Sequence, residues 1–356
     1  MHRSERNMPL SLSVLDLVPL AGTAEKAGAH SSQAIRNSLE LVRLADRLGY
    51  TRYWFAEHHN MPTIASTTPE ILIALAGEET SRIRVGSGGV MLPNHTSLKV
   101  AETFKMLEAL HPGRIDLGIG RAPGTDQATA LALRGSREAL GAEDFPQQLV
   151  DLLEYGGRGA PSRLAQPRSV VAIPQDVPLP PIWLLGSSDF SAHLAALLGT
   201  GYGFAAHFSD FPPEASMRAY RENFAAGGEF ARPHAILTLS VICAPTHEEA
   251  ERLLSSLLVA FARLRTGQPS LLLPPKEALA YRFTPAEYAI VASMRDRHIV
   301  GTPETVKSRI EELVQRTQAD EVMVSTFIYG HTERMRSYAL LAAAFALPGS
   351  EESDAL

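Results

Sequence analysis

The chain has 356 residues, of which 45% are hydrophobic and 20% are charged, an ordinary composition for a globular protein. A net charge of -6 and an isoelectric point near 6.1 argue against nucleic acid as the main partner. Cys243 is the only cysteine, which excludes an intramolecular disulfide and a thiolate metal cluster. The polar N-terminus lacks the apolar core of a signal peptide, and no apolar run approaches the roughly 18 residues that span a membrane. We therefore expect a cytoplasmic protein that acts on small molecules and binds neither nucleic acid nor a membrane.

Patterns typical of strands and helices alternate along the whole sequence. Strands are predicted at residues 10–18, 53–56, 83–92, 115–120, 181–185, 202–206, 235–243 and 321–327. Helices are predicted at residues 31–48, 100–111, 139–153, 192–198, 213–224, 248–264, 303–314 and 333–346, with one more beginning near Pro69. Because each strand is followed by a helix, consecutive strands should be parallel, with right-handed crossovers.

Eight strands that alternate with helices predict a (β/α)8 barrel, also called a TIM barrel. A doubly wound open sheet is the alternative, but strand-helix units fill the length of the chain without a linker. We therefore predict a single domain over residues 1–356. Three segments interrupt its rhythm: a polar loop after Arg121, an irregular excursion at residues 156–181, and an insertion at residues 265–298 that could form a lid.

The sequence Glu57-His58-His59 at the end of the second predicted strand invites a metal hypothesis. Adjacent side chains on a strand point to opposite faces, so three consecutive residues cannot converge on one ion. No metal site is therefore expected. A purely structural interpretation stays open, in which both histidines end the strand and bond backbone groups.

Two segments favour an anionic cofactor. Gly186-Ser187-Ser188 ends a predicted strand and opens a helix, so backbone N–H groups, two hydroxyls and the helix dipole could bind a phosphate. Arg121 ends another strand and would suit the same group. No G-x-G-x-x-G motif follows the first strand and no P-loop is present, so a Rossmann site for a nicotinamide dinucleotide is not indicated.

Taken together, four segments resemble the bacterial luciferase-like flavin monooxygenase family. They are residues 53–60 (YWFAEHHN), 85–93 (VGSGGVMLP), 112–121 (PGRIDLGIGR) and 300–303 (VGTP). The resemblance covers nearly the whole chain, in the family's order, and the family fold is the barrel that the periodicity predicts. Light-emitting members carry a reactive cysteine just before the arginine, where this chain has Gly120, which speaks against light emission.

The resemblance implies roles for individual residues. Glu57 and His58 would lie beside the flavin ring, with His58 as the catalytic histidine. Gly88 and Gly89 would be joined by a cis peptide bond under the isoalloxazine. Arg121 and the turn formed by Gly186, Ser187 and Ser188 would bind the phosphate.

The resemblance also implies an activity. Members similar to this chain use reduced FMN (FMNH2) and dioxygen (O2), and oxygenate a small organic substrate through a C4a-peroxyflavin. A separate flavin reductase would supply FMNH2, the insertion would close over the site, and we expect a homodimer. Two alternatives remain: an oxidoreductase that uses the deazaflavin F420, and a non-catalytic flavin-binding paralogue. No pattern in the sequence identifies the organic substrate; a long-chain aldehyde is suggested by analogy only.

Overall fold

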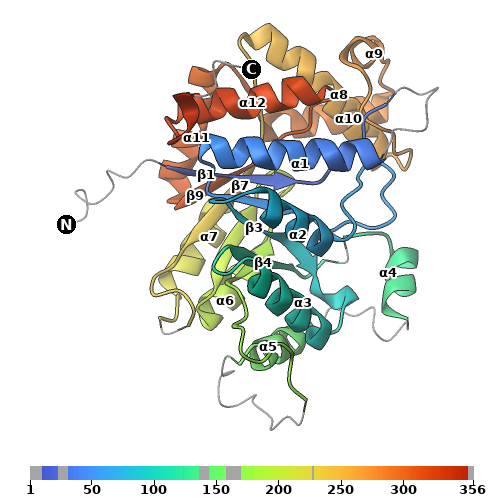
Figure 1. The fold of residues 1–356 in the computed structure, drawn as a ribbon. Helices are drawn as coiled ribbons and strands as arrows, with labels where there is room; N and C mark the ends of the chain where they lie inside the picture. The colour runs from blue at the N-terminus through green and yellow to red at the C-terminus, as the bar shows by residue number, and fades with distance from the viewer. Residues whose placement is uncertain are drawn as a thin grey trace.

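The computed structural model describes residues 10–22, 31–122, 124–135, 144–157, 170–226 and 228–351. Within these ranges the strands are β1 (Ser11–Asp16), β2 (Arg52–Phe55), β3 (Arg84–Met91), β4 (Ile115–Gly120), β5 (Ile182–Gly186), β6 (Gly201–Ala205), β7 (Ala235–Cys243), β8 (His298–Gly301) and β9 (Glu321–Ser325). They form one parallel sheet in the order β6-β5-β4-β3-β2-β1-β9-β7-β8, and pairing of β6 with β7 closes it. All strands except β8 therefore form a closed barrel (Figure 1). The predicted (β/α)8 barrel is confirmed, because a doubly wound sheet would stay open.

Helices surround the barrel. They are α1 (Ser31–Leu48), α2 (Pro69–Glu79), α3 (Ser97–Leu110), α4 (Gln127–Arg134), α5 (Phe145–Tyr155), α6 (Asp189–Leu198), α7 (Pro213–Glu222), α8 (His247–Arg265), α9 (Pro275–Ala280), α10 (Pro285–Met294), α11 (Pro303–Thr317) and α12 (His331–Ala344), with 3-10 turns η1 (Leu92–Asn94) and η3 (Arg295–Arg297). The first and last helices, α1 and α12, pack side by side and complete the ring (Figure 1). None of the helices in the described ranges has both the length and the apolar character needed to cross a bilayer.

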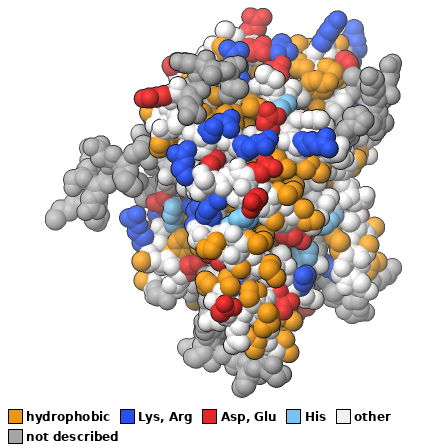
Figure 2. All heavy atoms as spheres, viewed as in Figure 1, with side chains coloured by type: hydrophobic (Ala, Val, Ile, Leu, Met, Phe, Trp, Pro, Cys, Tyr) orange, Lys and Arg blue, Asp and Glu red, His pale blue; other side chains and the backbone are white. Residues whose placement is uncertain are grey.

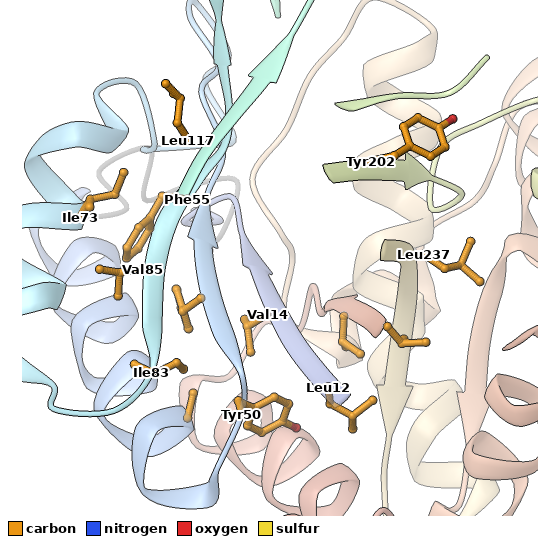
Figure 3. Packing of buried hydrophobic residues seen from close by; sticks show 14 of the residues in the cluster. Leu12, Val14, Tyr50, Phe55, Ile73, Ile83, Val85, Leu117, Tyr202 and Leu237 are labelled. Carbon is orange, nitrogen blue, oxygen red and sulfur yellow. The ribbon is translucent and has the colours of Figure 1, made fainter. Parts of the chain in front are cut away.

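Side chains along each strand alternate between two apolar layers, as the period of two requires. On β1, Leu12 and Val14 point outward into the layer between strands and helices, which Figure 3 shows. Leu15 points inward and packs with Trp54 and Trp183 inside the barrel. Both layers are buried, so the strands are fixed in register from both sides.

Ion pairs fill the end of the barrel where the strands begin. Arg52, the first residue of β2, lies 2.8 Å from Asp116 on β4 and 2.7 Å from Glu321 on β9. Arg84 of β3 lies 2.7 Å from the other oxygen of Asp116. Burial would raise the pKa of Glu321, but Arg52 and His234 hold it down at about 2. These side chains occupy the N-terminal end, and barrels of this kind bind their ligands at the other, C-terminal end of the strands.

The helix α4 and the strand β8 were not predicted. The predicted polar loop after Arg121 contains α4, whose N-cap Asp126 accepts a hydrogen bond from the backbone of Thr129. Only Ala130 of this helix is buried, so no apolar stripe marked it in the sequence. The strand β8 was also missed, because its four residues follow directly on the predicted insertion. It pairs with β7 beyond the point where β6 ends.

Other predicted segments lie partly outside the described ranges. The helix predicted at 139–153 begins at Phe145 as α5, and residues 136–143 are not described. Of the predicted excursion at 156–181, residues 158–169 are not described, and residues 170–181 contain neither helix nor strand.

The insertion at 265–298 contains α9, α10 and η3, and it crosses the C-terminal rim of the barrel. Leu272 exchanges two backbone hydrogen bonds of 3.0 Å with Leu20 and Gly22, in the segment after β1. At the other end, Arg297 pairs with Asp210, after β6, at 2.6 Å. The insertion thus has the position that a lid requires, while its closing motion stays a prediction.

Candidate active site

Glu57 is a buried carboxylate just after β2, fixed by three donors. Nε2 of His59 and Nε2 of His95 each lie 2.8 Å from its Oε1, and the backbone N–H of Met91 lies 2.9 Å from its Oε2. Burial would raise the pKa of Glu57, but the hydrogen bonds, and above all the one from His95, outweigh it and lower the pKa. Glu57 is therefore an ionised, immobilised carboxylate at neutral pH.

The next residue, His58, has a defined tautomer. Its Nδ1 lies 3.1 Å from the carbonyl oxygen of Gly124. A carbonyl oxygen only accepts hydrogen bonds, so Nδ1 carries the proton and the lone pair of the neutral ring is on Nε2. Burial lowers the pKa of His58, although the Gly124 carbonyl and the charge of Glu57 act in the opposite direction. At neutral pH, Nε2 can thus accept a proton.

The segment Glu57-His58-His59 is not on a strand, although the metal argument from the sequence assumed one. The strand β2 ends at Phe55, so Glu57, His58 and His59 lie in a loop, where Glu57 and His59 bond each other. In the ranges that the structure describes, no cluster of three or more His, Cys, Asp or Glu side chains is arranged to bind a metal. The structural interpretation expected both histidine side chains to bond backbone groups. The side chain of His58 does so at the Gly124 carbonyl, whereas the side chain of His59 bonds Glu57.

Gly88 and Gly89 form part of the wall at the C-terminal end of β3. The peptide bond between them is cis, as the resemblance implied. A β-carbon on Gly88 would lie 2.5 Å from Cδ1 of Leu15, and one on Gly89 would lie 2.7 Å from the carbonyl oxygen of Gly118. Neither position accepts a side chain, so bare backbone lines this part of the barrel.

Arg121 lies beside the start of α6. Its guanidinium carbon is 4.2 Å from the centroid of the Phe190 ring, in the first turn of that helix. Ser188 is the N-cap residue of α6, yet its side chain makes no capping hydrogen bond. The cation therefore lies near the N-terminal start of a helix, and the two residues before that helix, Ser187 and Ser188, carry hydroxyls. This donor set fits a dianionic phosphate.

Three histidines that the sequence did not assign to the site also lie here. His95 bonds Glu57, while His207 follows β6 and His298 begins β8. Burial lowers the pKa of His207 to about 4 although the backbone of Thr238 acts in the opposite direction, and His58 and His298 lower it further. The His207 ring is therefore close enough to interact with each of the other two. The position of His207 at the end of a strand was visible in the sequence. His298 had no such signal, because β8 was not predicted.

A cavity of about 820 Å³ lies between α8 and the segment around α9. Its charged side chains include the pairs Arg252–Glu249 and Arg295–Glu251. None of the predicted site residues lines it.

Comparison with known proteins decides the family. The family model described as luciferase-like monooxygenase matches residues 17–321. The chain belongs to this family. The Bacillus subtilis protein YvbT is 45% identical to this luciferase-like monooxygenase over 331 residues, which are 93% of this chain and 95% of YvbT. A luciferase-like monooxygenase of Escherichia coli K12 is 38% identical over 93% of this chain and 96% of its own. The N-acetyl-S-alkylcysteine monooxygenase of B. subtilis is 34% identical over 94% and 98%.

Solved structures share the fold of this family member. Apo-MsnO8 superimposes with a TM-score of 0.86 at 38% identity, over 95% of this chain and 99% of that one. More distant structures show the fold alone. The oxygenating constituent of 3,6-diketocamphane monooxygenase from Pseudomonas putida, in complex with FMN, has a TM-score of 0.66 at 18% identity over 96% and 98%. An F420-dependent secondary alcohol dehydrogenase has 0.67 at 13% over 96% and 99%.

Proposed function

We propose that this luciferase-like monooxygenase binds FMNH2 and uses O2 to oxygenate a small organic molecule. The observation that carries the proposal is the arrangement at the C-terminal end of the barrel. Arg121 lies against the start of α6, where the two would bind a phosphate, and the fixed carboxylate Glu57 and the neutral base His58 lie at the same end. In such a reaction the protein has to bind the phosphate of the flavin and to transfer protons.

The described residues fit FMN in two places. Arg121, Ser187 and Ser188 would bind the phosphate, through a cation, two hydroxyls and the helix start. The bare backbone of Gly88 and Gly89 would lie under the flat ring, beside Glu57. Bound reduced flavin supplies the electrons that activate O2, and the protein supplies position, electrostatics and the exclusion of water.

His58 would move a proton in this reaction. Its Nδ1–H is fixed on the Gly124 carbonyl, so Nε2 is the atom that takes up and returns the proton. The lowered pKa keeps Nε2 free at neutral pH. The insertion at 265–298 would close the site and keep water out during the reaction.

The known relatives support flavin-dependent oxygenation. A relative at 34% identity is named as a monooxygenase, and a fold neighbour contains FMN. Another neighbour uses F420, which makes F420 the competing cofactor. We further propose that a separate reductase supplies FMNH2. Such a reductase would depend on a nicotinamide cofactor, and we therefore propose that the protein acts in the cytoplasm.

We also propose a homodimer, formed through the outer faces of α2 and α3. Ile71 and Leu75 on α2 and Met106 and Leu110 on α3 are exposed, one helical turn apart on adjacent helices. Figure 2 shows apolar side chains gathered over this part of the surface. Clustered apolar side chains on a surface often mark an interface, and a two-fold axis would cover these four with the same face of a second copy. Leu75→Glu combined with Leu110→Glu should give monomers in analytical ultracentrifugation; an unchanged mass would contradict this interface.

A cofactor titration tests the proposed function. The wild-type protein should bind FMN, and Arg121→Ala should bind it at least about tenfold more weakly, because a charge-assisted hydrogen bond contributes about 1.5–3 kcal/mol. Arg309→Ala is the matched control, since Arg309 is an exposed arginine on α11. Isothermal titration calorimetry measures both affinities. Tighter binding of F420 than of FMN would instead favour a deazaflavin-dependent oxidoreductase.

A further inference from the structure

A row of polar side chains crosses three neighbouring strands near the C-terminal rim of the barrel. In register, Ser240 of β7 lies beside Ser325 of β9 on one side and beside His298 of β8 on the other. Residues in register share a face of the sheet. Nδ1 of His298 lies 2.8 Å from Oγ of Ser240. Ser325, Ser240 and His298 are called the rim row below.

The strand period places the rim row on the inner face. On β9, Met323 packs inside the barrel, so Ser325, two residues later, faces the same way. On β7, Ile236 packs inside, and Ser240, four residues later, again shares its face. The row therefore lies on the inner side of the barrel, above the apolar interior.

Several atoms of this region lack a partner although they are buried. Among the described side chains, Oγ of Ser325 and Nε2 of His298 are two such atoms, and Nδ1 of His207 is a third. Buried polar groups are nearly always hydrogen-bonded, so unpaired atoms on the inner face of a candidate active site point to a missing ligand. His207 follows β6, which lies across the closed barrel from β2 and His58. The rings of His58 and His207 are nevertheless close enough to affect each other electrostatically.

The chemistry of the row defines what it can bind. The hydroxyl of Ser240 can donate to Nδ1 of His298, which leaves the proton of that ring on Nε2. Nε2 of His298 and the hydroxyl of Ser325 can then both donate to one oxygen atom. Burial lowers the pKa of His298 to about 4, as it does for His207, so both rings are neutral at physiological pH. The nearest cations, Arg295 and Arg297, also lower the pKa of His298, but each is paired with a carboxylate, Glu251 and Asp210. An anion in the row would therefore lack an unpaired cation among these residues, and transfer of a carboxylate into such a site is costly.

We propose that the rim row, together with His207, is the subsite that holds the polar head group of the organic substrate, and that this group is an uncharged carbonyl or amide. Its oxygen would accept hydrogen bonds from Ser325 and His298, at the same end of the barrel as the proton acceptor Nε2 of His58. The subsite serves the proposed monooxygenase reaction, so its assignment rests on that function.

A matched pair of probes tests the subsite: hexanamide and hexanoate have the same shape and differ in charge. Protein with ¹⁵N-labelled histidine and saturating FMN is titrated with each probe, and the imidazole resonances are followed by NMR. Hexanamide should shift the resonances of His298 and His207, and hexanoate should bind at least about tenfold more weakly. Ser325→Ala, which removes only one hydroxyl, should weaken hexanamide binding about threefold to tenfold. His247→Gln, at an exposed histidine on α8, should leave it unchanged.

Three results would overturn the proposal: hexanoate binding as tightly as hexanamide, unchanged resonances of both histidines, or full hexanamide affinity in Ser325→Ala. If Ser325→Ala weakens FMN binding by the same factor, the row belongs to the cofactor site instead. Should the protein bind no FMN, the same titration on the flavin-free protein separates the two questions. A hexanamide response that depends on Ser325 would then support the subsite while the proposed function fails.

Discussion

Nε2 of His95 lies 2.8 Å from Oε1 of Glu57, which connects the segment after β3 to the segment after β2. The two pKa shifts agree with each other. Burial acts against the charge on both residues, yet the pKa of Glu57 is lowered and the pKa of His95 is raised. Each partner therefore stabilises the ionised form of the other. His95 fixes the carboxylate that we place beside the flavin.

This ion pair predicts a pH dependence of stability. The pKa of His95 in the folded protein lies above its ordinary value of about 6.5. The stabilisation is therefore fully present below about pH 6.5 and is lost as the pH rises through the folded-state value. Urea unfolding from about pH 6 to about pH 9 should show this decline in the wild type and a weaker decline in His95→Gln. The exposed histidine variant His247→Gln should behave as the wild type. Parallel curves for all three proteins would contradict the pairing.

The ion pairs at the N-terminal end of the barrel predict a large effect on stability. Arg52→Met leaves Asp116 and Glu321 as buried carboxylates without this partner, which should cost about 3–5 kcal/mol. Arg43→Met removes the exposed pair with Glu79 and should cost at most about 1 kcal/mol. Urea unfolding at neutral pH measures both free energies. Equal values for the two variants would show that the buried network does not stabilise the fold.

Much of the fold was predictable, because it depends on local patterns. Alternation along β1 or β4 and the apolar stripe of α1 each record which side of an element is buried. The elements that were missed lack this record. The helix α4 buries only Ala130, and β8 has four residues that are stabilised by pairing with β7 rather than by their own pattern.

The candidate site was predictable for residues whose position follows from their own strand. Glu57, Arg121 and Gly186 follow or end predicted strands, and parallel strands bring their C-terminal ends together. The partners of these residues depend on long-range contacts instead. His95 is 38 residues from Glu57 in the sequence, and His298 is 58 residues from Ser240. Such pairings follow from the closed barrel and from no spacing in the sequence.

The geometry of His58 predicts a separation of binding from turnover. Nδ1 of His58 is bonded to the Gly124 carbonyl, and we assign its Nε2 to proton transfer rather than to cofactor binding. His58→Ala should therefore keep the FMN affinity. Its turnover should fall by about 10²–10⁴, the usual contribution of a general base. The substrate comes from a screen of small organic compounds with isotope-labelled O2, chemically reduced FMN and the wild-type protein. In the wild type, turnover should also fall on acidification below the lowered pKa of His58, and this acid limb should be absent in the variant. Equal losses of affinity and turnover would make His58 a binding residue.

The last prediction is that this chain does not reduce its own flavin. Nicotinamide-driven reduction needs a place for the dinucleotide, and no G-x-G-x-x-G motif follows β1 and no P-loop occurs in the sequence. Some flavin barrels accept a nicotinamide at the flavin face without such a motif, so the experiment has to decide. In anaerobic buffer, FMN mixed with the protein and NADH or NADPH should keep the visible absorbance of oxidised flavin.

Addition of a flavin reductase should bleach that absorbance at once, which serves as the positive control. Addition of air should then restore it more slowly with the protein than without it, because a closed site keeps water from the reduced flavin. Arg121→Ala should reduce this delay in proportion to its weaker FMN binding, whereas Arg309→Ala should not. Prompt bleaching by the barrel and NADH or NADPH alone would mean that flavin reduction and oxygenation occur on one polypeptide. No separate reductase would then be needed.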